Sequence, residues 1–170
     1  MRDVILPWAM AGVGLGDDVL EVGPGYGAVT DVLCQSVPRL TSVEIDGDLA
    51  AMLTERFAAI STVQIVHGDA TALDEPDGRF SGAACFTMLH HVPTPELQDR
   101  LFAEVARVLR AGAVLVASDS LASDVLASNH DGDTYNPVDP ASLPGRLAAA
   151  GFAEIEVRTN EFGWAAVAHA

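Results

Sequence analysis

Basic residues are scarce in this sequence: nine stand against 24 aspartates and glutamates, which gives a formal net charge of −15. A surface this acidic repels phosphate backbones, so we expect no nucleic-acid partner for the chain alone. The charge also predicts a well-solvated surface, and the apolar half of the composition predicts a globular protein with a core.

Cysteines and long apolar runs are also few. Cys34 and Cys85 are far apart and form no C-x-x-C pair, which predicts buried thiols in a reducing compartment, without a disulfide or a metal site. The longest apolar run, "AGAVLVAS", is too short to span a bilayer, and the first ten residues have no signal-peptide layout. We therefore expect a cytoplasmic protein without membrane insertion.

Repeats and low-complexity linkers are absent, so residues 1–170 are predicted to form one domain with a short N-terminal helical segment over about 1–15. Short β-branched runs alternate with amphipathic segments. They predict strands at 18–22, 40–45, 62–66, 81–88, 113–118, 152–159 and 162–170, and helices at 27–36, 48–60, 94–112 and 141–151.

Strands that alternate with helices predict an α/β fold, a parallel sheet covered on both faces. The last two strands have no helix between them, so they should pair as an antiparallel hairpin at one edge. A polar stretch at 119–140 is long for a loop in a compact domain, which makes it a candidate lid or acceptor loop.

The stretch "VLEVGPGYGAVT" (19–30) places three glycines directly after the first predicted strand. Ligands of such sheets bind at the carboxyl ends of strands where the strand order reverses, and glycines there allow close approach of the backbone. Two ligand classes fit, a dinucleotide and S-adenosylmethionine. Glu21, just before the turn, suits the cationic parts of S-adenosylmethionine and would be unfavourable beside a pyrophosphate.

Four motifs in order carry a resemblance to a known family: "VLEVGPGYG", "SVEID", "VHGDATAL", and "FTMLHHV" followed by "RVLRAGAVLVASD". Together they resemble the class I S-adenosylmethionine-dependent methyltransferases, in the small-molecule, ubiquinone-biosynthesis-like branch (type 11). The resemblance covers nearly the whole chain from Asp18. It implies a Rossmann-like doubly wound sheet with strand order 3-2-1-4-5-7-6 and S-adenosylhomocysteine as the product.

The resemblance also implies roles for individual residues. Glu44 would bind both ribose hydroxyls, and Phe86 or Thr87 would offer a backbone carbonyl to the ammonium. Asp46 reads instead as the cap of the following helix. The remaining implied contacts are Glu21, Gly23, Gly25 and Gly27 around the methionine part, Ile45 packed on the adenine, and Asp69 with the Ala70 backbone N–H at the adenine edge.

The acceptor site is less defined. His90 and His91 follow the fourth strand and are the candidate general bases, although either could simply line the pocket. A polar cluster in the long loop, with His130, Asp133 and Tyr135, is a candidate acceptor site. No metal is expected, because this cluster lacks the closing glutamate of a calcium loop, and Thr87 and Met88 stand where metal-dependent relatives have an acid.

Some features leave alternatives open. Ser81 and Ala111 replace an aspartate and a proline that are typical of the family, and only a short segment precedes the glycine turn. The cleft is therefore either open or covered by the 119–140 loop or another chain, for which a homodimer is one arrangement. The alternatives are a catalytically weak module that needs a partner chain, an RNA methyltransferase, and a nicotinamide-dependent oxidoreductase. "SVEIDGDLA" resembles ribosomal-RNA adenine dimethylases, but their N-P-P-Y-type motif is absent.

Overall fold

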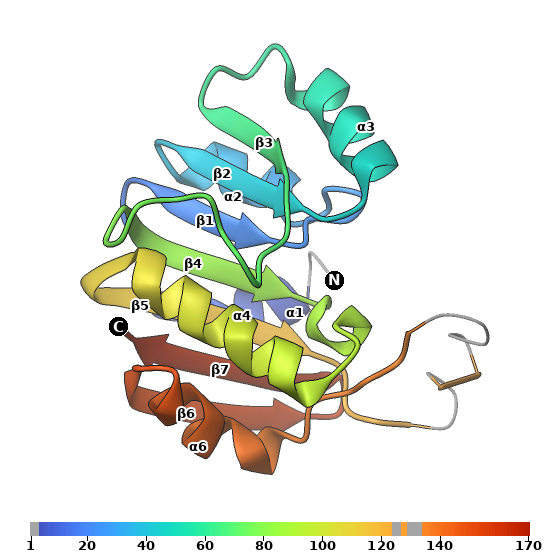
Figure 1. Cartoon of the computed structure of the whole chain (residues 1–170), viewed down its shortest axis with the longest axis vertical. Helices are drawn as coiled ribbons and strands as arrows, with labels where there is room; N and C mark the ends of the chain where they lie inside the picture. Colours follow the sequence, from blue (N-terminus) through green and yellow to red (C-terminus); the bar gives the residue numbers. More distant parts are fainter. Residues whose placement is uncertain (1–3, 124–126, 129–133) are drawn as a thin grey trace.

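The computed structural model describes residues 4–123, 127–128 and 134–170. Its seven-stranded sheet has the order β3-β2-β1-β4-β5-β7-β6, with β7 antiparallel to both neighbours (Figure 1), which confirms the predicted fold class and closing hairpin. The elements are α1 (Ile5–Ala9), β1 (Val19–Val22), α2 (Thr30–Ser36), β2 (Leu40–Glu44), α3 (Gly47–Phe57), β3 (Val63–His67), β4 (Phe80–Phe86), η1 (Leu89–His91), α4 (Pro95–Val108), β5 (Leu109–Asp119), η2 (Pro140–Ser142), α6 (Leu143–Ala149), β6 (Ala153–Asn160) and β7 (Gly163–His169).

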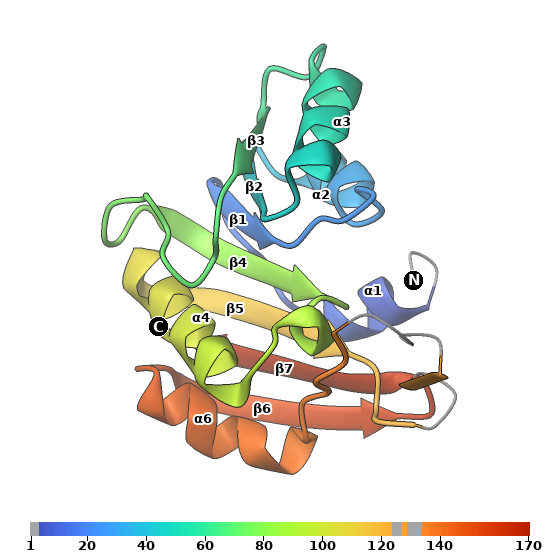
Figure 2. The ribbon, with the colours of Figure 1, turned by 45° about the vertical axis from the view of Figure 1, so that its right-hand side comes forward.

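Helices cover both faces of the sheet. Helices α4 and α6 bury Leu101, Phe102 and Leu143 against one face, whereas α1 and α2 bury Leu6 and Leu33 against the other. Helix α3 lies on the same side as α2 (Figure 2). The central strands are therefore enclosed on both faces, and ligands can reach them only at their ends.

Two helix starts follow the sequence prediction closely. The Asp46 carboxylate accepts hydrogen bonds from the N–H groups of Asp48 (2.9 Å) and Leu49 (3.0 Å), so Asp46 caps α3 as expected. The Thr94 hydroxyl oxygen accepts from the N–H of Leu97, and proline occupies the first helical position of α4. Capping thus fixes where the chain turns into a helix after β2 and after η1.

Three predicted helix ends are wrong by three or more residues, one of them in α3, which ends at Phe57 and not at residue 60. Helix α2 begins at Thr30 and not at Gly27, because Gly27 has a φ of +77°, outside the helical region. Helix α4 ends at Val108, and the chain passes directly into β5. Gly112, predicted to end the helix, has a φ of +77° within β5, where the register with β4 shifts, and its N–H donates to the Ala170 carbonyl at 2.6 Å.

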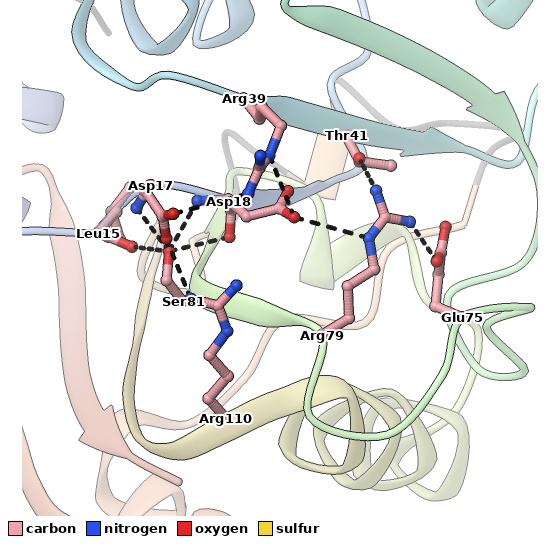
Figure 3. Close-up of polar contacts among 9 residues, drawn as sticks. All are labelled: Leu15, Asp17, Asp18, Arg39, Thr41, Glu75, Arg79, Ser81 and Arg110. Carbon is pink, nitrogen blue, oxygen red and sulfur yellow. Dashed lines mark hydrogen bonds and ion pairs between the residues drawn. The ribbon is translucent and has the colours of Figure 1, made fainter.

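The amino ends of the central strands are tied together by a polar network (Figure 3). The Ser81 hydroxyl oxygen accepts hydrogen bonds from the N–H groups of Asp17 (2.8 Å) and Asp18 (2.9 Å), which joins β4 to the residues before β1. The Asp18 carboxylate lies between the guanidinium groups of Arg39 (3.4 Å) and Arg79 (3.9 Å). This end of the sheet is closed by its own side chains, which leaves the carboxyl ends for a ligand.

Candidate functional site

A cavity of about 790 Å³ lies at the carboxyl ends of β1, β2 and β4, where the strand order reverses. Every cofactor residue predicted from the sequence except Gly27 lines this cavity, and so does His91. The predicted residues that the structure brings together are Glu21, Gly23, Gly25, Glu44, Ile45, Asp69, Ala70, Phe86, Thr87 and His91. Motifs spread over some 70 residues of chain therefore converge on one volume.

The glycine turn forms one wall of the cavity. Gly23 and Gly25 have φ values of +64° and +54°, a conformation that glycine adopts without strain. A Cβ atom at Gly25 would meet no protein atom within 4 Å, so this backbone is open to the cavity. Gly27 has a different part: a Cβ there would lie 2.7 Å from the Leu53 side chain, so Gly27 lets the turn pack against α3.

Glu21 is the unusual residue of the site. Its side chain is 2% exposed, and its Oε2 accepts hydrogen bonds from the hydroxyls of Ser42 (2.6 Å) and Thr30 (2.8 Å). Its Oε1 is buried without a hydrogen-bond partner. Burial raises the pKa of Glu21 to about 7; the two hydroxyl hydrogen bonds oppose the rise, and the charge of Glu44 adds to it. A buried acceptor without a donor is costly, so a ligand with a positive group would satisfy it.

Glu44, at the end of β2, connects the glycine turn to the start of α3. Its Oε2 accepts from the Gly25 N–H at 2.9 Å, and its Oε1 accepts from the Asp46 N–H at 3.0 Å. The side chain is 5% exposed and borders the cavity. These two bonds hold the carboxylate in place before any ligand arrives, which is the preorganisation that a binding group needs.

The far end of the cavity combines a polar edge with an apolar wall. Asp69 is exposed, and its Oδ1 accepts from the Thr71 N–H at 2.8 Å, which fixes the carboxylate beside the buried Ala70. Ile45 is 68% exposed at the mouth. The sequence analysis missed the apolar wall formed by Val92, Leu97 and Leu101. The 3.6-residue spacing in α4 was the signal that could have placed the two leucines there.

The backbone leaves β4 through a strained residue. Thr87 has a φ of +51°, which is uncommon for a residue with a side chain, and its N–H donates to the Ser118 carbonyl at 2.8 Å. The preceding Phe86 is buried, and both residues border the cavity. Strain of this kind is typical of ligand sites, where the surrounding structure holds it in place.

The two histidines of η1 differ in their surroundings. His91 is exposed and lines the cavity, whereas His90 is half-buried and does not line it. The Nδ1 atom of His90 lies 2.8 Å from Oδ1 and 2.9 Å from Oδ2 of Asp119, at the end of β5. Sequence reasoning missed Asp119, for which its place after the last residue of a predicted strand was the available signal.

The predicted acceptor cluster is described only in part. His130 and Asp133 lie outside the described residues. Tyr135 is described: its ring lies edge-on to that of His90, with centroids 6.2 Å apart, and its hydroxyl accepts from the Ser123 N–H at 3.3 Å. The described end of the long loop thus lies beside His90.

A second cavity, of about 290 Å³, lies over β5, β6 and β7 beside residues 11–14, and Arg158 at its wall already donates to the Ala9 carbonyl at 2.9 Å. Within the described ranges, no three His, Cys, Asp or Glu side chains gather closely enough to hold a metal ion. A search of the same residues found no helix with the length and apolar character of a membrane span.

Comparison with known proteins matches residues 19–112 to a family described as a methyltransferase domain. Ribosomal RNA small subunit methyltransferase A of Geobacter sulfurreducens is 39% identical over 74 residues, which are 42% of this chain and 27% of that protein. The protein of the same name from Leifsonia xyli subsp. xyli is 36% identical over 115 residues, 65% of this chain and 40% of that protein. The matches thus span less than half the length of either relative.

Solved structures show the same architecture. A SAM-dependent methyltransferase from Methanosarcina mazei aligns with a TM-score of 0.76 and 17% identity, and the alignment covers 96% of each chain. At this identity the likeness shows a shared fold.

Proposed function

The chain belongs to the methyltransferase-domain family, whose model matches more than half of its length, and we propose that it transfers a methyl group from S-adenosylmethionine to a small-molecule acceptor. The observation that carries this proposal is the buried, unpartnered Oε1 of Glu21 beside a cavity whose described lining includes no arginine or lysine. The methyl donor has an ammonium and a sulfonium to offer this carboxylate. A dinucleotide would instead bring a pyrophosphate to it, with like charges in contact.

The described residues fit this cofactor part by part. We assign Glu21 and the backbone after Phe86 to the ammonium, the Gly23–Gly25 turn to the methionine part, and the Glu44 carboxylate to the ribose hydroxyls. The adenine end would be formed by Ile45, Asp69, Ala70 and the apolar wall on α4. When bound, the cofactor supplies a methyl carbon that its positive sulfur has already activated, so the protein mainly has to align the acceptor and exclude water.

The distribution of charge supports a small-molecule acceptor. Six of the eight arginines in the described residues are ion-paired with an aspartate or glutamate, which leaves little positive surface for a phosphate backbone. The partial matches to ribosomal-RNA methyltransferases favour RNA as the second candidate. Against it, the residues after β4 read Thr87, Met88 and Leu89, without the N-P-P-Y-type motif of adenine-N6 enzymes.

Thermal unfolding with S-adenosylmethionine, S-adenosylhomocysteine and NAD, each in large excess, tests the proposal. At a hundredfold excess over Kd, binding adds about 2.7 kcal/mol, so the midpoint should rise by roughly 5–10 °C with the two adenosyl compounds and not with NAD. No shift with either adenosyl compound contradicts the proposal. Tight binding of a short RNA at physiological salt would favour the second candidate.

A catalytically weak module that needs a partner chain, a second copy included, remains the alternative from another class. Such a module would have the same cofactor site as an active enzyme. Methyl transfer therefore distinguishes the two alternatives, whereas cofactor binding does not. A protein that binds S-adenosylhomocysteine but methylates nothing in a broad acceptor panel, alone and at high concentration, would favour it.

We also propose a cytoplasmic location. Cys34 and Cys85 are both free. Cys85 is buried as predicted, which raises the pKa of its thiol, whereas Cys34 is only half-buried and not buried as predicted. A free thiol that is partly exposed, as in Cys34, stays reduced in a reducing compartment, which supports this location. Fractionation of the native host cell tests this directly.

A further inference from the structure

We propose that His90 and Asp119 form a proton-accepting dyad, in which His90 is the base for a hydroxyl group of the methyl acceptor and Asp119 positions it. This inference rests on the proposed methyl transfer and adds the chemical class of the acceptor. It also separates two adjacent histidines that the sequence could not distinguish.

The Asp119 carboxylate contacts His90 at two groups, the ring Nδ1 and the backbone N–H. Both of its oxygens face the ring Nδ1, at 2.8 and 2.9 Å, and Oδ2 also accepts the backbone N–H of His90 at 3.0 Å. Its Oδ1 accepts the Ser120 N–H at 2.7 Å, and its side chain is 1% exposed. The carboxylate is thus fixed by the backbone, and it fixes the imidazole ring in turn.

This geometry sets the tautomer of the ring. An ionised carboxylate can only accept hydrogen bonds, so Nδ1 carries the proton and Nε2 is the basic nitrogen. If Nε2 takes up a proton, the positive ring lies directly against the Asp119 charge, which stabilises it. The rings of His67 and His169 lie instead against backbone carbonyls, those of Ile45 and Gly112.

His90 has neighbours both at the cofactor cavity and in the long loop. The centroid of its ring is 4.1 Å from that of His91, which lines the cavity. Its neighbours in the loop are Tyr135 and Asn136, and the Asn136 N–H donates to the His90 carbonyl at 2.7 Å. Both ribbon views show the segment after residue 134 running beside η1 (Figures 1 and 2). The dyad is therefore next to a residue that lines the cavity and next to the described end of the loop.

A base at this place indicates a hydroxyl acceptor. A neutral amine attacks a methyl carbon without first losing a proton, whereas a hydroxyl is a weak nucleophile until its proton leaves. In the proposed step the O–H bond breaks and its proton goes to Nε2 of His90. The electron pair left on oxygen forms the new O–C bond as the C–S bond of the donor breaks, and that pair stays on sulfur.

Diethyl pyrocarbonate, which acylates unprotonated imidazole nitrogens, tests the dyad without cofactor or acceptor. At a pH high enough to keep the ring neutral in both proteins, mass spectrometry should show His90 modified in the wild type and modified more slowly in Asp119→Asn, because a charged acceptor at Nδ1 makes Nε2 more nucleophilic than a neutral amide does. His169, at the other end of the sheet, is the internal reference and should react equally in both proteins. Unreactive His90 in the wild type, or an equal rate in the variant, overturns the dyad.

A second measurement needs no variant and so does not depend on the folding of Asp119→Asn. The ¹⁵N shifts of the histidine rings in the wild-type protein should place the His90 proton on Nδ1. The opposite tautomer overturns the inference.

The acceptor class is tested by transfer of labelled methyl groups from S-adenosylmethionine to para-substituted phenols and to benzylamine. His90→Gln should slow transfer to a weakly acidic phenol by roughly 100-fold and transfer to p-nitrophenol, already largely ionised, much less. A wild type that binds S-adenosylhomocysteine by calorimetry but methylates no phenol, or only the amine, contradicts the hydroxyl class. Absence of that binding would instead count against the proposed function, while the reactivity of His90 still decides the dyad.

Discussion

The two ends of the central strands treat charge in opposite ways. At the amino ends, Asp17 pairs with Arg39, and Asp18 lies between Arg39 and Arg79 (Figure 3). The Ser81 hydroxyl oxygen accepts hydrogen bonds from the backbone N–H groups of both aspartates. At the carboxyl ends, carboxylates border a cavity whose described lining has no arginine or lysine. Each end has one buried carboxylate oxygen without a hydrogen-bond partner, Oδ1 of Asp18 and Oε1 of Glu21, but only the Asp18 carboxylate faces arginines. One end stabilises the fold, and the other keeps negative charge available for a ligand.

The backbone repeats this contrast. Gly78, at the amino end of β4, and Gly25, at the carboxyl end of β1, both have positive φ values and open space beside them. Only the second borders the cavity, and there Thr87 also has a positive φ without being a glycine. Glu154, near the start of the edge strand β6, has a positive φ as well but does not line the cavity, so strain alone does not identify the site. Strain and uncompensated charge together mark the functional end of a sheet more clearly than either does alone.

The largest effect on binding is expected from Gly25→Val. A branched side chain at a φ of +54° would fill the space in which the cofactor contacts the protein backbone. The affinity for S-adenosylhomocysteine should therefore fall by roughly 3 kcal/mol, or about 100-fold in Kd. Isothermal calorimetry measures it. Gly78→Val is the matched control, with a φ of +65° and equally open space; it should lose similar stability and keep the affinity. Equal loss of affinity in both would remove the glycine turn from the site.

Glu21→Gln should raise the free energy of unfolding at neutral and higher pH, and it should lower the affinity for the cofactor. The folded protein holds the Glu21 proton up to a pH of about 7, whereas the unfolded chain releases it near 4.5. The native state therefore binds more protons in this window, so the free energy of unfolding falls as the pH rises from 4.5 to 7, by about 3 kcal/mol.

Denaturant unfolding of both proteins from pH 4 to 8 measures this difference. Relative to the wild type, Glu21→Gln should gain about 3 kcal/mol in unfolding free energy between the two ends of the range. Curves that stay parallel would show that the Glu21 carboxylate is solvated and not the buried group described above.

Ser81→Ala should reduce the free energy of unfolding by about 1–3 kcal/mol, because the N–H groups of Asp17 and Asp18 lose their acceptor. Urea denaturation measures the loss. The affinity for S-adenosylhomocysteine should not change, since this network is at the opposite end of the sheet. A change in affinity would mean that the two ends are coupled through β4.

Glu44→Ala should weaken the binding of S-adenosylhomocysteine by about 1–3 kcal/mol. The variant loses a charged hydrogen-bond acceptor, and the Gly25 N–H loses its hydrogen bond to Glu44. Calorimetry with the variant measures this, and Thr94→Ala, which removes the cap of α4 outside the lining of the cavity, serves for comparison. An unchanged affinity in Glu44→Ala would take this carboxylate out of the site.

The smallest effect is expected from Arg110→Gln. This guanidinium forms an exposed pair with Asp17 at 3.0 Å, and such pairs contribute less than about 1 kcal/mol. Its urea midpoint should be close to that of the wild type, and added salt should reduce even that difference. A loss of stability as large as that expected for Ser81→Ala would mean that the Arg110 pair is coupled to the rest of the polar network at the amino ends.

The parallel sheet with its closing hairpin and the position of the cavity were predictable from alternating apolar runs and from the glycines and acids placed directly after them. The full strand order was implied by the family resemblance. Other features depend on contacts distant in sequence. Gly112 looks like a helix end until its N–H is seen to pair with Ala170. The sequence does not distinguish His90 from His91, because only the fold shows that Asp119 contacts the His90 ring. In the same way, only the fold shows that Thr30 and Ser42 bind one oxygen of Glu21 and leave the other without a partner.

The claim that Glu21 recognises the ammonium is tested most directly by a double-mutant cycle in calorimetry, with wild type and Glu21→Gln each titrated with S-adenosylhomocysteine and its deaminated analogue. The wild type should prefer the amino compound by about 1–3 kcal/mol, and the variant should lose most of that preference. The same preference in both proteins would contradict the assignment, and the unpaired charge at the carboxyl end of the sheet would then need another ligand.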